Sequence, residues 1–271
     1  MLGKYLPLVP LLLLALNSFA AAGSVQVAVA SNFSKPMQQI AAAFESETGH
    51  QASLSFGSSG KFVAQISHGA PFDVFLSADT DKPLKLIEMG LADAETMFTY
   101  ARGRLVLWSA DADYLAVGSE VLGQSDFRHI ALAESRLAPY GRAAQEVLEK
   151  LQLTEKLSGK IVTGENISQA FQFISTRNAE LGFVAAAQVY RGGKLQRGSA
   201  WLIPDTYYTP IRQDAILLHN GRDNVAAKQL MVFLRSETAV EIMRNFAYQL
   251  PVDNDSVADH SGVGVDVDLR D

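Results

Sequence analysis

Residues 24–59, SVQVAVASNFSKPMQQIAAAFESETGHQASLSFGSS, contain the pattern that decides the fold class of this chain. A valine-rich run at 25–29 is typical of a strand, and the segment after it carries apolar side chains at helical spacing. Ser34 is expected to cap this helix and Gly49 to end it, because both residue types favour those positions. A second strand is expected at 52–56. Strand, helix and strand in this order predict an α/β protein with a largely parallel sheet.

The same alternation continues along the chain. Further strands are expected at 73–76, 104–108 and 182–185, further helices at 82–89, 143–151, 167–174 and 224–235, and a β-rich segment at 207–218. The strands and helices predicted between 104–108 and 207–218 are enough to form an α/β lobe of their own. This order indicates that the chain crosses into a second lobe and then returns to the first. We therefore predict two α/β lobes with a ligand cleft between them. Residues 23–103 and 216–252 form the discontinuous lobe 1, and residues 104–215 form lobe 2.

Both ends of the chain are expected to lie outside these lobes. Residues 1–22 combine a lysine at position 4, an apolar run and small residues before a cleavage point, which is typical of a secretory signal peptide. The apolar run is shorter than the roughly 20 residues that span a bilayer. Residues 253–271 carry six aspartates and one arginine, a composition that favours a solvated, disordered tail. The mature protein is therefore expected to be soluble and periplasmic.

The composition argues against several classes of function. The chain contains no cysteine, which excludes thiolate catalysis and iron–sulfur clusters, and its five histidines lie singly without metal-ligand spacing. No direct protein–metal ligands are therefore expected. The formal charge of −6 becomes −7 when the single lysine of the signal peptide is removed. This charge disfavours nucleic acid and anionic lipid as partners, so a bound anion would have to be held by local dipoles.

Three predicted strand-to-helix turns, at 31–34, 57–60 and 139–142, are rich in hydroxyl groups or glycine. Each places backbone N–H groups at the start of a helix, where they lack intrahelical partners and the aligned peptide dipoles favour an anion. In open α/β sheets such turns meet at the carboxyl ends of the strands. A serine beside a helix start is more often only a cap, so Ser31 or Ser59 alone would favour that interpretation. Their combination favours an oxyanion site.

Other motifs match catalytic or nucleotide-binding patterns only in part. The turn at 57–60 is followed by Lys61, but a phosphate loop requires four residues between its glycines. Asp73 and Asp79 could be drawn as an acid–base pair, yet a strand-edge hydrogen bonder and a helix cap explain them more simply. No nucleophile, base and orienting group occur together. The chain is therefore not expected to be an enzyme, and an exported hydrolase is kept as the alternative from a different class.

Four stretches of the sequence point to a known family. They are AVAS at 28–31, SFGSSG at 55–60, GAPFDVFLSAD at 69–79 and APYG at 138–141, and they occur in this order. In these stretches the chain resembles the periplasmic molybdate-binding proteins of ABC importers, and the resemblance runs from Val25 to Pro251. It implies the class II periplasmic binding protein fold, with two α/β lobes and the ligand in the cleft between them.

The resemblance also implies a binding site made only of neutral hydrogen-bond donors. The implied donors are Ser31 and Ser59 by hydroxyl and backbone N–H, Ile167 by backbone N–H, Tyr140 in the third turn, and the amide N–H of Asn32. Many members of the family add a tyrosine hydroxyl from the position that is occupied here by Ala185. We expect the hydroxyl of Tyr140 to replace it from the opposite wall.

The implied ligand is molybdate or tungstate, so molybdenum or tungsten enters only as the oxyanion, and no cofactor is implied. A site built from donors alone penalises an anion that keeps a proton, because that proton would be buried without an acceptor. The implied role is a monomeric periplasmic solute-binding protein that delivers the anion to the permease of an ABC transporter in the inner membrane. The alternatives are another tetrahedral oxyanion such as sulfate or chromate, a small organic acid, and a role as a sensor.

Overall fold

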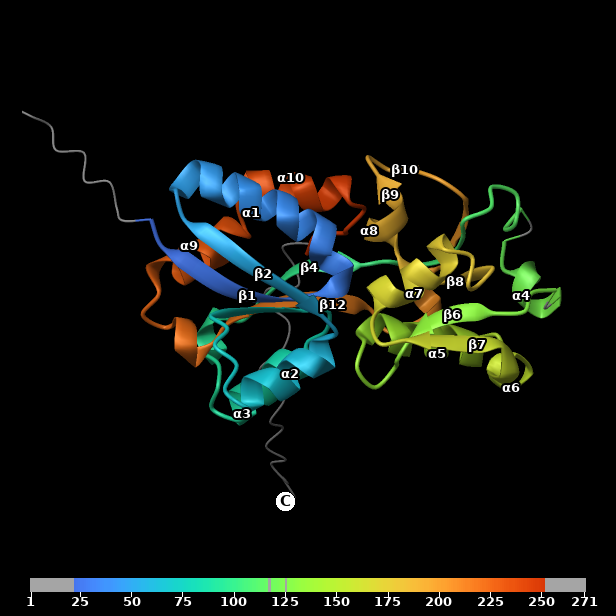
Figure 1. Ribbon diagram of the computed structural model, residues 1–271, viewed down its shortest axis with the longest axis horizontal. Helices are drawn as coiled ribbons and strands as arrows, with labels where there is room; N and C mark the ends of the chain where they lie inside the picture. The colour runs from blue at the N-terminus through green and yellow to red at the C-terminus, as the bar shows by residue number, and fades with distance from the viewer. Residues whose placement is uncertain (1–21, 117, 125, 252–271) are drawn as a thin grey trace, which may run out of the picture.

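Two five-stranded sheets form the two halves of the molecule (Figure 1). The structure, a computed structural model, describes residues 22–116, 118–124 and 126–251. The predicted acidic tail and all but the last residue of the predicted signal peptide lie outside these ranges. Among the residues described, no helix is long and apolar enough to cross a bilayer.

The first lobe is built on a sheet that is covered by helices. Its strands lie in the order β2 (Gln51–Gly57), β1 (Ser24–Ala30), β3 (Val74–Ser77), β12 (Ile211–Leu217) and β4 (Phe98–Gly103). Its helices are α1 (Ser34–Thr48), α2 (Ser59–Ser67), α3 (Asp81–Glu88), α9 (Val225–Phe233) and α10 (Glu237–Asn245). β1 is parallel to β2 and β3, whereas β12 is antiparallel to β3 and β4.

The second lobe repeats this plan. Its strands lie in the order β11 (Ser199–Leu202), β5 (Leu105–Ser109), β8 (Leu181–Ala185), β6 (Ile130–Ala133) and β7 (Ile161–Gly164). Its helices are α4 (Glu120–Gln124), α5 (Pro139–Lys150), α6 (Thr154–Leu157), α7 (Ile167–Ser175) and α8 (Ala186–Val189), and a short ribbon joins β9 (Tyr190–Arg191) to β10 (Lys194–Leu195). β5 is antiparallel to both of its neighbours, β11 and β8, and runs opposite to the other four strands of this sheet. The prediction of largely parallel sheets is confirmed, with one reversed strand in each.

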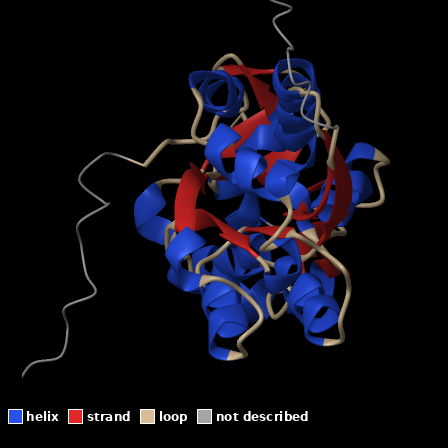
Figure 2. Ribbon diagram, turned by 90° about the vertical axis from the view of Figure 1, so that its left-hand side faces the viewer, coloured by secondary structure: helices blue, strands red, loops and turns tan. Residues whose placement is uncertain are grey.

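The valine-rich composition of β1 follows from burial of the sheet on both faces. Val25, Val27 and Val29 pack in a cluster with α1, α9 and α10. Ala28, which points to the opposite face, packs with side chains of α2 and α3. Figure 2 shows the strands running between helices on either side. A parallel sheet covered on both faces is expected to consist of nearly continuous apolar runs, as this strand does.

The chain passes between the lobes at strands that follow each other almost directly. β4 ends at Gly103 in the first sheet, and β5 begins at Leu105 in the second. The return differs from the prediction, because β12 pairs with β3 and β4 from Ile211 onward. Residues 211–215, which the predicted boundary assigned to lobe 2, therefore lie in the first sheet. We propose that the second crossing runs through residues 203–210.

Several predicted helix boundaries are corrected by the structure. Ser34 does not cap α1, since the 3-10 turn η1 (Ser31–Phe33) precedes the helix and Phe33 takes the cap position without a side-chain bond. Gly49 ends the helix as predicted, with a φ of 74° that favours glycine. α5 begins at Pro139, ahead of the predicted start at 143, because proline is tolerated at the first position of a helix. No sequence prediction covered α10.

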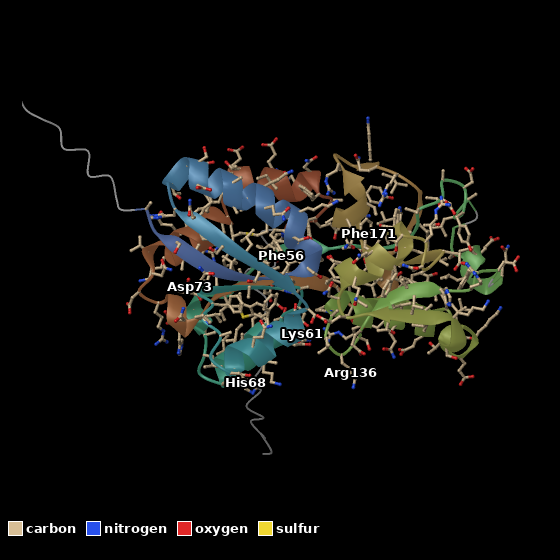
Figure 3. The ribbon with its side chains drawn as sticks, viewed as in Figure 1. Phe56, Lys61, His68, Asp73, Arg136 and Phe171 are labelled. Carbon is tan, nitrogen blue, oxygen red and sulfur yellow. The ribbon has the colours of Figure 1, made fainter. Side chains whose placement is uncertain are left out.

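Asp73 and Asp79 both accept backbone N–H groups, although the cap position of α3 is occupied by Thr80 and not by Asp79 as predicted. The Asp73 carboxylate accepts hydrogen bonds from the Gln26 N–H at 2.7 Å and from the side chains of Asn220 and Asn224 at 3.0 and 3.2 Å. The Asp79 carboxylate accepts the N–H of Lys82 in the first turn of α3. In Figure 3, Asp73 lies on the side of the first lobe that faces away from the second. Both carboxylates therefore hold elements of the first lobe together.

Candidate functional site

A cavity lies between the lobes, and all five predicted binding residues line it. Ser31, Asn32 and Ser59 belong to the first lobe, and Tyr140 and Ile167 belong to the second. The rest of the wall consists of alanine, proline, serine and asparagine side chains. None of the described residues on the wall carries a formal charge. An anion in this cavity would therefore be held by neutral groups.

The five residues share one structural position, the first turn of a helix that follows a strand. Ser31 and Asn32 begin η1 after β1, and Ser59 begins α2 after β2. Tyr140 is the second residue of α5 after β6, and Ile167 is the first residue of α7 after β7. Backbone N–H groups at such positions have no intrahelical acceptor and lie at the positive end of the helix dipole. Four helix starts from two lobes thus face one cavity.

Neither of the two predicted serines acts as a helix cap. Ser31 follows the cap position of η1, which is occupied by Ala30, and Ser59 follows the cap position of α2, which is occupied by Ser58. The hydroxyl oxygen of Ser59 accepts the N–H of Ala78 at 3.0 Å. This bond fixes the oxygen and leaves its own O–H free to donate. Helix capping, which is the more common role of a serine beside a helix start, is therefore not the role of Ser31 or Ser59 in this structure.

The side-chain amide of Asn32 donates both of its hydrogens to other residues of the protein. Its Nδ2 donates to Oε1 of Gln213 at 2.8 Å and to the hydroxyl of Tyr248 at 2.9 Å, which uses both amide hydrogens. The backbone N–H of Asn32 is what remains for a ligand. The side chain connects the wall of the cavity to β12, the strand by which the chain re-enters the first sheet.

The hydroxyl of Tyr140 packs against residues that do not line the cavity. It lies close to Tyr248 and so tightly against Gly103 that a Cβ at that glycine would overlap its oxygen, and neither neighbour lines the cavity. It makes no hydrogen bond of standard geometry with a described residue. Burial raises the pKa of this hydroxyl well above its usual range, so it stays protonated. The structure thus leaves the backbone N–H of Tyr140 as its available donor, and Ala185 likewise lies off the cavity wall.

Two hydrogen bonds join the lobes beside the cavity. The N–H of Gly60, in α2, donates to the carbonyl of Leu137 at 3.0 Å. The hydroxyl of Ser168, in α7, donates to the carbonyl of Ser31 at 3.1 Å. Each bond starts from a residue next to a predicted binding residue. The lobes therefore contact each other through the same turns that form the cavity.

Ion pairs add to this contact at the surface. Lys61 pairs with Glu165 at 2.6 Å, and Arg142 pairs with Asp81 at 2.9 Å and with Asp79 at 3.5 Å. Figure 3 shows Lys61 on the side of the first lobe that faces the second. Pairs between exposed side chains contribute little each, about 0.2–1 kcal/mol. These ion pairs therefore contribute little to the stability of the contact between the lobes.

Three cationic side chains lie near the start of α1, those of Lys35, Arg191 and Arg197. None of them has a carboxylate partner in the described part of the chain. Lys35 lies with its Nζ 6.0 Å from the ring centre of Phe171, which belongs to the second lobe (Figure 3). Partial burial, and then the charges of Arg191 and Arg197, lower the pKa of Lys35. None of the three lines the cavity. They give this part of an acidic protein a local positive field that attracts anions.

Some residues of the site were missed by the sequence analysis. Ser58 and Asn166 line the cavity, and Leu137 provides the carbonyl that meets Gly60. Ser58 lies beside Ser59 in the turn at 57–60. The sequence therefore indicated a binding serine in this turn, but only Ser59 was predicted to contact the ligand. Asn166 caps α7 by accepting the N–H groups of the following turn, a role that its sequence position indicates. In the part of the chain that the structure describes, no cluster of three potential metal-ligating side chains occurs.

Two α/β lobes, joined by crossing strands around one cavity, define a periplasmic binding protein. The chain belongs to the family described as bacterial extracellular solute-binding proteins, whose model matches residues 25–249. It is 50% identical over 231 residues to the molybdate-binding protein ModA of Azotobacter vinelandii, covering 85% of this chain and 92% of the relative. It is 49% identical over 229 residues to ModA of Rhodobacter capsulatus, covering 84% and 89%.

Solved structures show the same likeness. The periplasmic molybdate-binding protein of Azotobacter vinelandii superimposes with a TM-score of 0.81 and 39% identity, covering 84% of this chain and all of that chain. The sulfate-binding protein SubI of Mycobacterium tuberculosis superimposes with a TM-score of 0.68 over 85% of this chain and 88% of that chain, at 12% identity. At that identity the second likeness shows the fold alone.

Gly60→Ala is expected to weaken ligand binding without removing any atom from the cavity. A Cβ at this position would lie 3.1 Å from Cα and 3.2 Å from the carbonyl oxygen of Leu137, so the lobes could not approach as closely. Overpacking of this kind costs about 1–3 kcal/mol. We expect the Kd for molybdate, measured by titration calorimetry, to rise about tenfold or more.

The matched control is Gly123→Ala in α4, where a Cβ would meet no atom within 4 Å. Its Kd should equal that of the wild type. An unchanged Kd for Gly60→Ala would show that close contact at this turn is not required for binding.

Tyr140→Phe is expected to leave binding almost unchanged, because the hydroxyl lies away from the cavity. The Kd should stay within about threefold of the wild type. The free energy of unfolding in urea should change by less than about 1 kcal/mol, since this hydroxyl makes no hydrogen bond of standard geometry with a described residue. Tyr208→Phe is the matched control and should lower it by about 1 kcal/mol, because the N–H of Leu105 loses its acceptor. A tenfold loss of affinity in Tyr140→Phe would place its hydroxyl on the ligand.

Proposed function

We propose that this protein captures molybdate in the periplasm and delivers it to an ABC importer in the inner membrane. The observation that carries the proposal is the convergence of four helix starts, from both lobes, on one uncharged cavity. The relatives named above, which are molybdate-binding proteins, support the choice of anion. Export through the predicted signal peptide and action as a monomer belong to the same proposal.

The proposed donors come from both sides of the anion. Ser31 and Ser59 provide their hydroxyls and N–H groups, and Asn32 provides its backbone N–H, all from the first lobe. Tyr140 and Ile167 provide backbone N–H groups from the second lobe. The bond from the Ala78 N–H to the Ser59 oxygen supports this assignment, because it occupies the oxygen and directs the proton elsewhere. Hydrogen bonds to an ion are roughly twice as strong as those between neutral groups.

Selectivity among anions follows from this set of donors. A site without acceptors suits a fully deprotonated tetrahedral dianion, whereas the remaining proton of hydrogen phosphate would be buried unpaired at a cost of about 1–3 kcal/mol. Sulfate has the right charge but is smaller than molybdate. Donors that are fixed by the backbone at about 2.7–2.9 Å from a larger anion would reach a smaller one poorly. Tungstate is close to molybdate in size and is expected to bind as well.

An anion held by both lobes also stabilises their contact. Donors from the first lobe alone would bind it more weakly, so the liganded protein favours the arrangement in which the lobes meet. This is how a transporter can distinguish loaded from empty protein. Among the described residues of the cavity wall there is no arginine, which disfavours an organic carboxylate as the ligand.

The direct test is titration calorimetry of the mature protein, residues 23–271, after bound ligand has been removed by unfolding and refolding. Molybdate, tungstate, sulfate, phosphate and chromate are added in turn. We expect tight one-to-one binding of molybdate and tungstate, and at least about a hundredfold weaker binding of sulfate and phosphate. Preference for sulfate, phosphate or chromate would contradict the proposal while leaving the fold unaffected.

The backbone donors are testable through Ile167. It is the first residue of α7, where proline is tolerated, and Asn166 before it is extended, with φ −147° and ψ 173°, as proline requires. Ile167→Pro removes the proposed N–H donor and should raise the Kd for molybdate at least about tenfold. Ile167→Ala, the matched control, keeps the N–H while losing side-chain volume and should change the Kd less than about threefold. Equal effects in the two variants would refute this backbone donor.

A further inference from the structure

The hydroxyl of Ser58 is buried on the cavity wall without a partner. Ser58 is 2% exposed and lines the cavity, yet its oxygen makes no hydrogen bond with any described residue. Native proteins leave few buried hydroxyls unpaired, because each forfeits the hydrogen bonds that it made with water. A buried, unpaired hydroxyl in a ligand cavity therefore requires an explanation.

Helix capping does not provide this explanation. Ser58 is the cap residue of α2 and has the extended backbone, φ −78° and ψ 145°, from which a serine normally accepts the N–H of the second or third helical residue. Its side chain makes no such bond. The second helical residue is Gly60, and its N–H donates instead to Leu137 of the other lobe. The contact between the lobes thus uses the N–H of Gly60, which a capping Ser58 hydroxyl would otherwise accept.

Two other hydroxyls near the site, those of Ser59 and Tyr140, do not share this combination of features. The Ser59 oxygen is already bonded to the N–H of Ala78. The Tyr140 hydroxyl lies against Gly103 and Tyr248, which do not line the cavity. Ser58 alone among these three places an unpaired hydroxyl in the wall.

We propose that the Ser58 hydroxyl is a sixth contact residue for the bound oxyanion, donating its proton to one of the anion's oxygens. This inference rests on the proposed function, since it takes a tetrahedral oxyanion as the occupant of the cavity. A serine hydroxyl rotates freely about its C–O bond, so it can direct its proton to an oxygen that the fixed backbone N–H groups do not reach. The first lobe then offers three hydroxyls, from Ser31, Ser58 and Ser59, and the second lobe offers backbone N–H groups.

Two substitutions separate ligand binding from capping. Ser58→Ala removes the hydroxyl and is a poor cap, whereas Ser58→Gly removes the hydroxyl and is nearly as good a cap as serine. Both should raise the Kd for molybdate, measured by titration calorimetry, by about ten- to hundredfold, the usual effect of deleting a hydrogen bond to an ion. Ser55→Ala, an exposed serine in β2, is the matched control and should change the Kd less than about twofold.

Thermal unfolding of the ligand-free variants completes the test. Ser58→Gly is expected to stay within a few degrees of the wild type, so that its loss of affinity reflects the missing donor. Wild-type affinity in both variants would overturn the inference, and so would a loss in Ser58→Ala that Ser58→Gly does not share, because that pattern belongs to capping. In either case binding of molybdate by the wild type would leave the proposed function intact. A wild-type protein that binds no oxyanion would overturn both.

Discussion

The binding site depends on N–H groups at the starts of helices, which have no intrahelical acceptor. Four such starts meet at one cavity, and the described residues of the wall between them include no charged side chain. Each start exists because a strand ends there and the chain turns directly into a helix, so the sheets determine where the donors lie. Groups that are fixed in this way need no reorganisation when an anion arrives. An acidic chain can therefore bind an anion with its backbone.

Each lobe has its own sheet, and the chain crosses between the two sheets twice. β4 leads into β5 with one residue between them, and β12 returns to the first sheet beside β3. The reversed strand of each sheet is the one that continues directly from a crossing. The side chain of Asn32, on the cavity wall, donates hydrogen bonds to Gln213 in β12 and to Tyr248. Movement of β12 would therefore be transmitted to Asn32, on the cavity wall, through the hydrogen bond between Asn32 and Gln213.

The strand and helix periods of the sequence predicted most of the fold, because burial on both faces of the sheets produces long apolar runs. They did not separate the return at 203–210 from β12, since both are rich in β-forming residues. The five candidate residues were predicted from helix-start chemistry and from the family resemblance, and the structure brings them to one cavity. The direction of the Tyr140 side chain was not predictable, because it depends on packing against Gly103, far away in sequence. Ser58 stands in the turn at 57–60 that the sequence singled out, but the lack of a hydrogen-bond partner for its hydroxyl was not predictable, because it is a property of the assembled lobes.

The bonds from Gly60 to Leu137 and from Ser168 to Ser31 close the cavity at the turns that also supply the donors. Release of a bound ion therefore requires the lobes to separate, and that separation withdraws the donors of one lobe all at once. Unloading needs no proton transfer, no competing anion and no chemical change in the cargo. A membrane partner that held the lobes apart would convert tight retention into rapid release by movement alone.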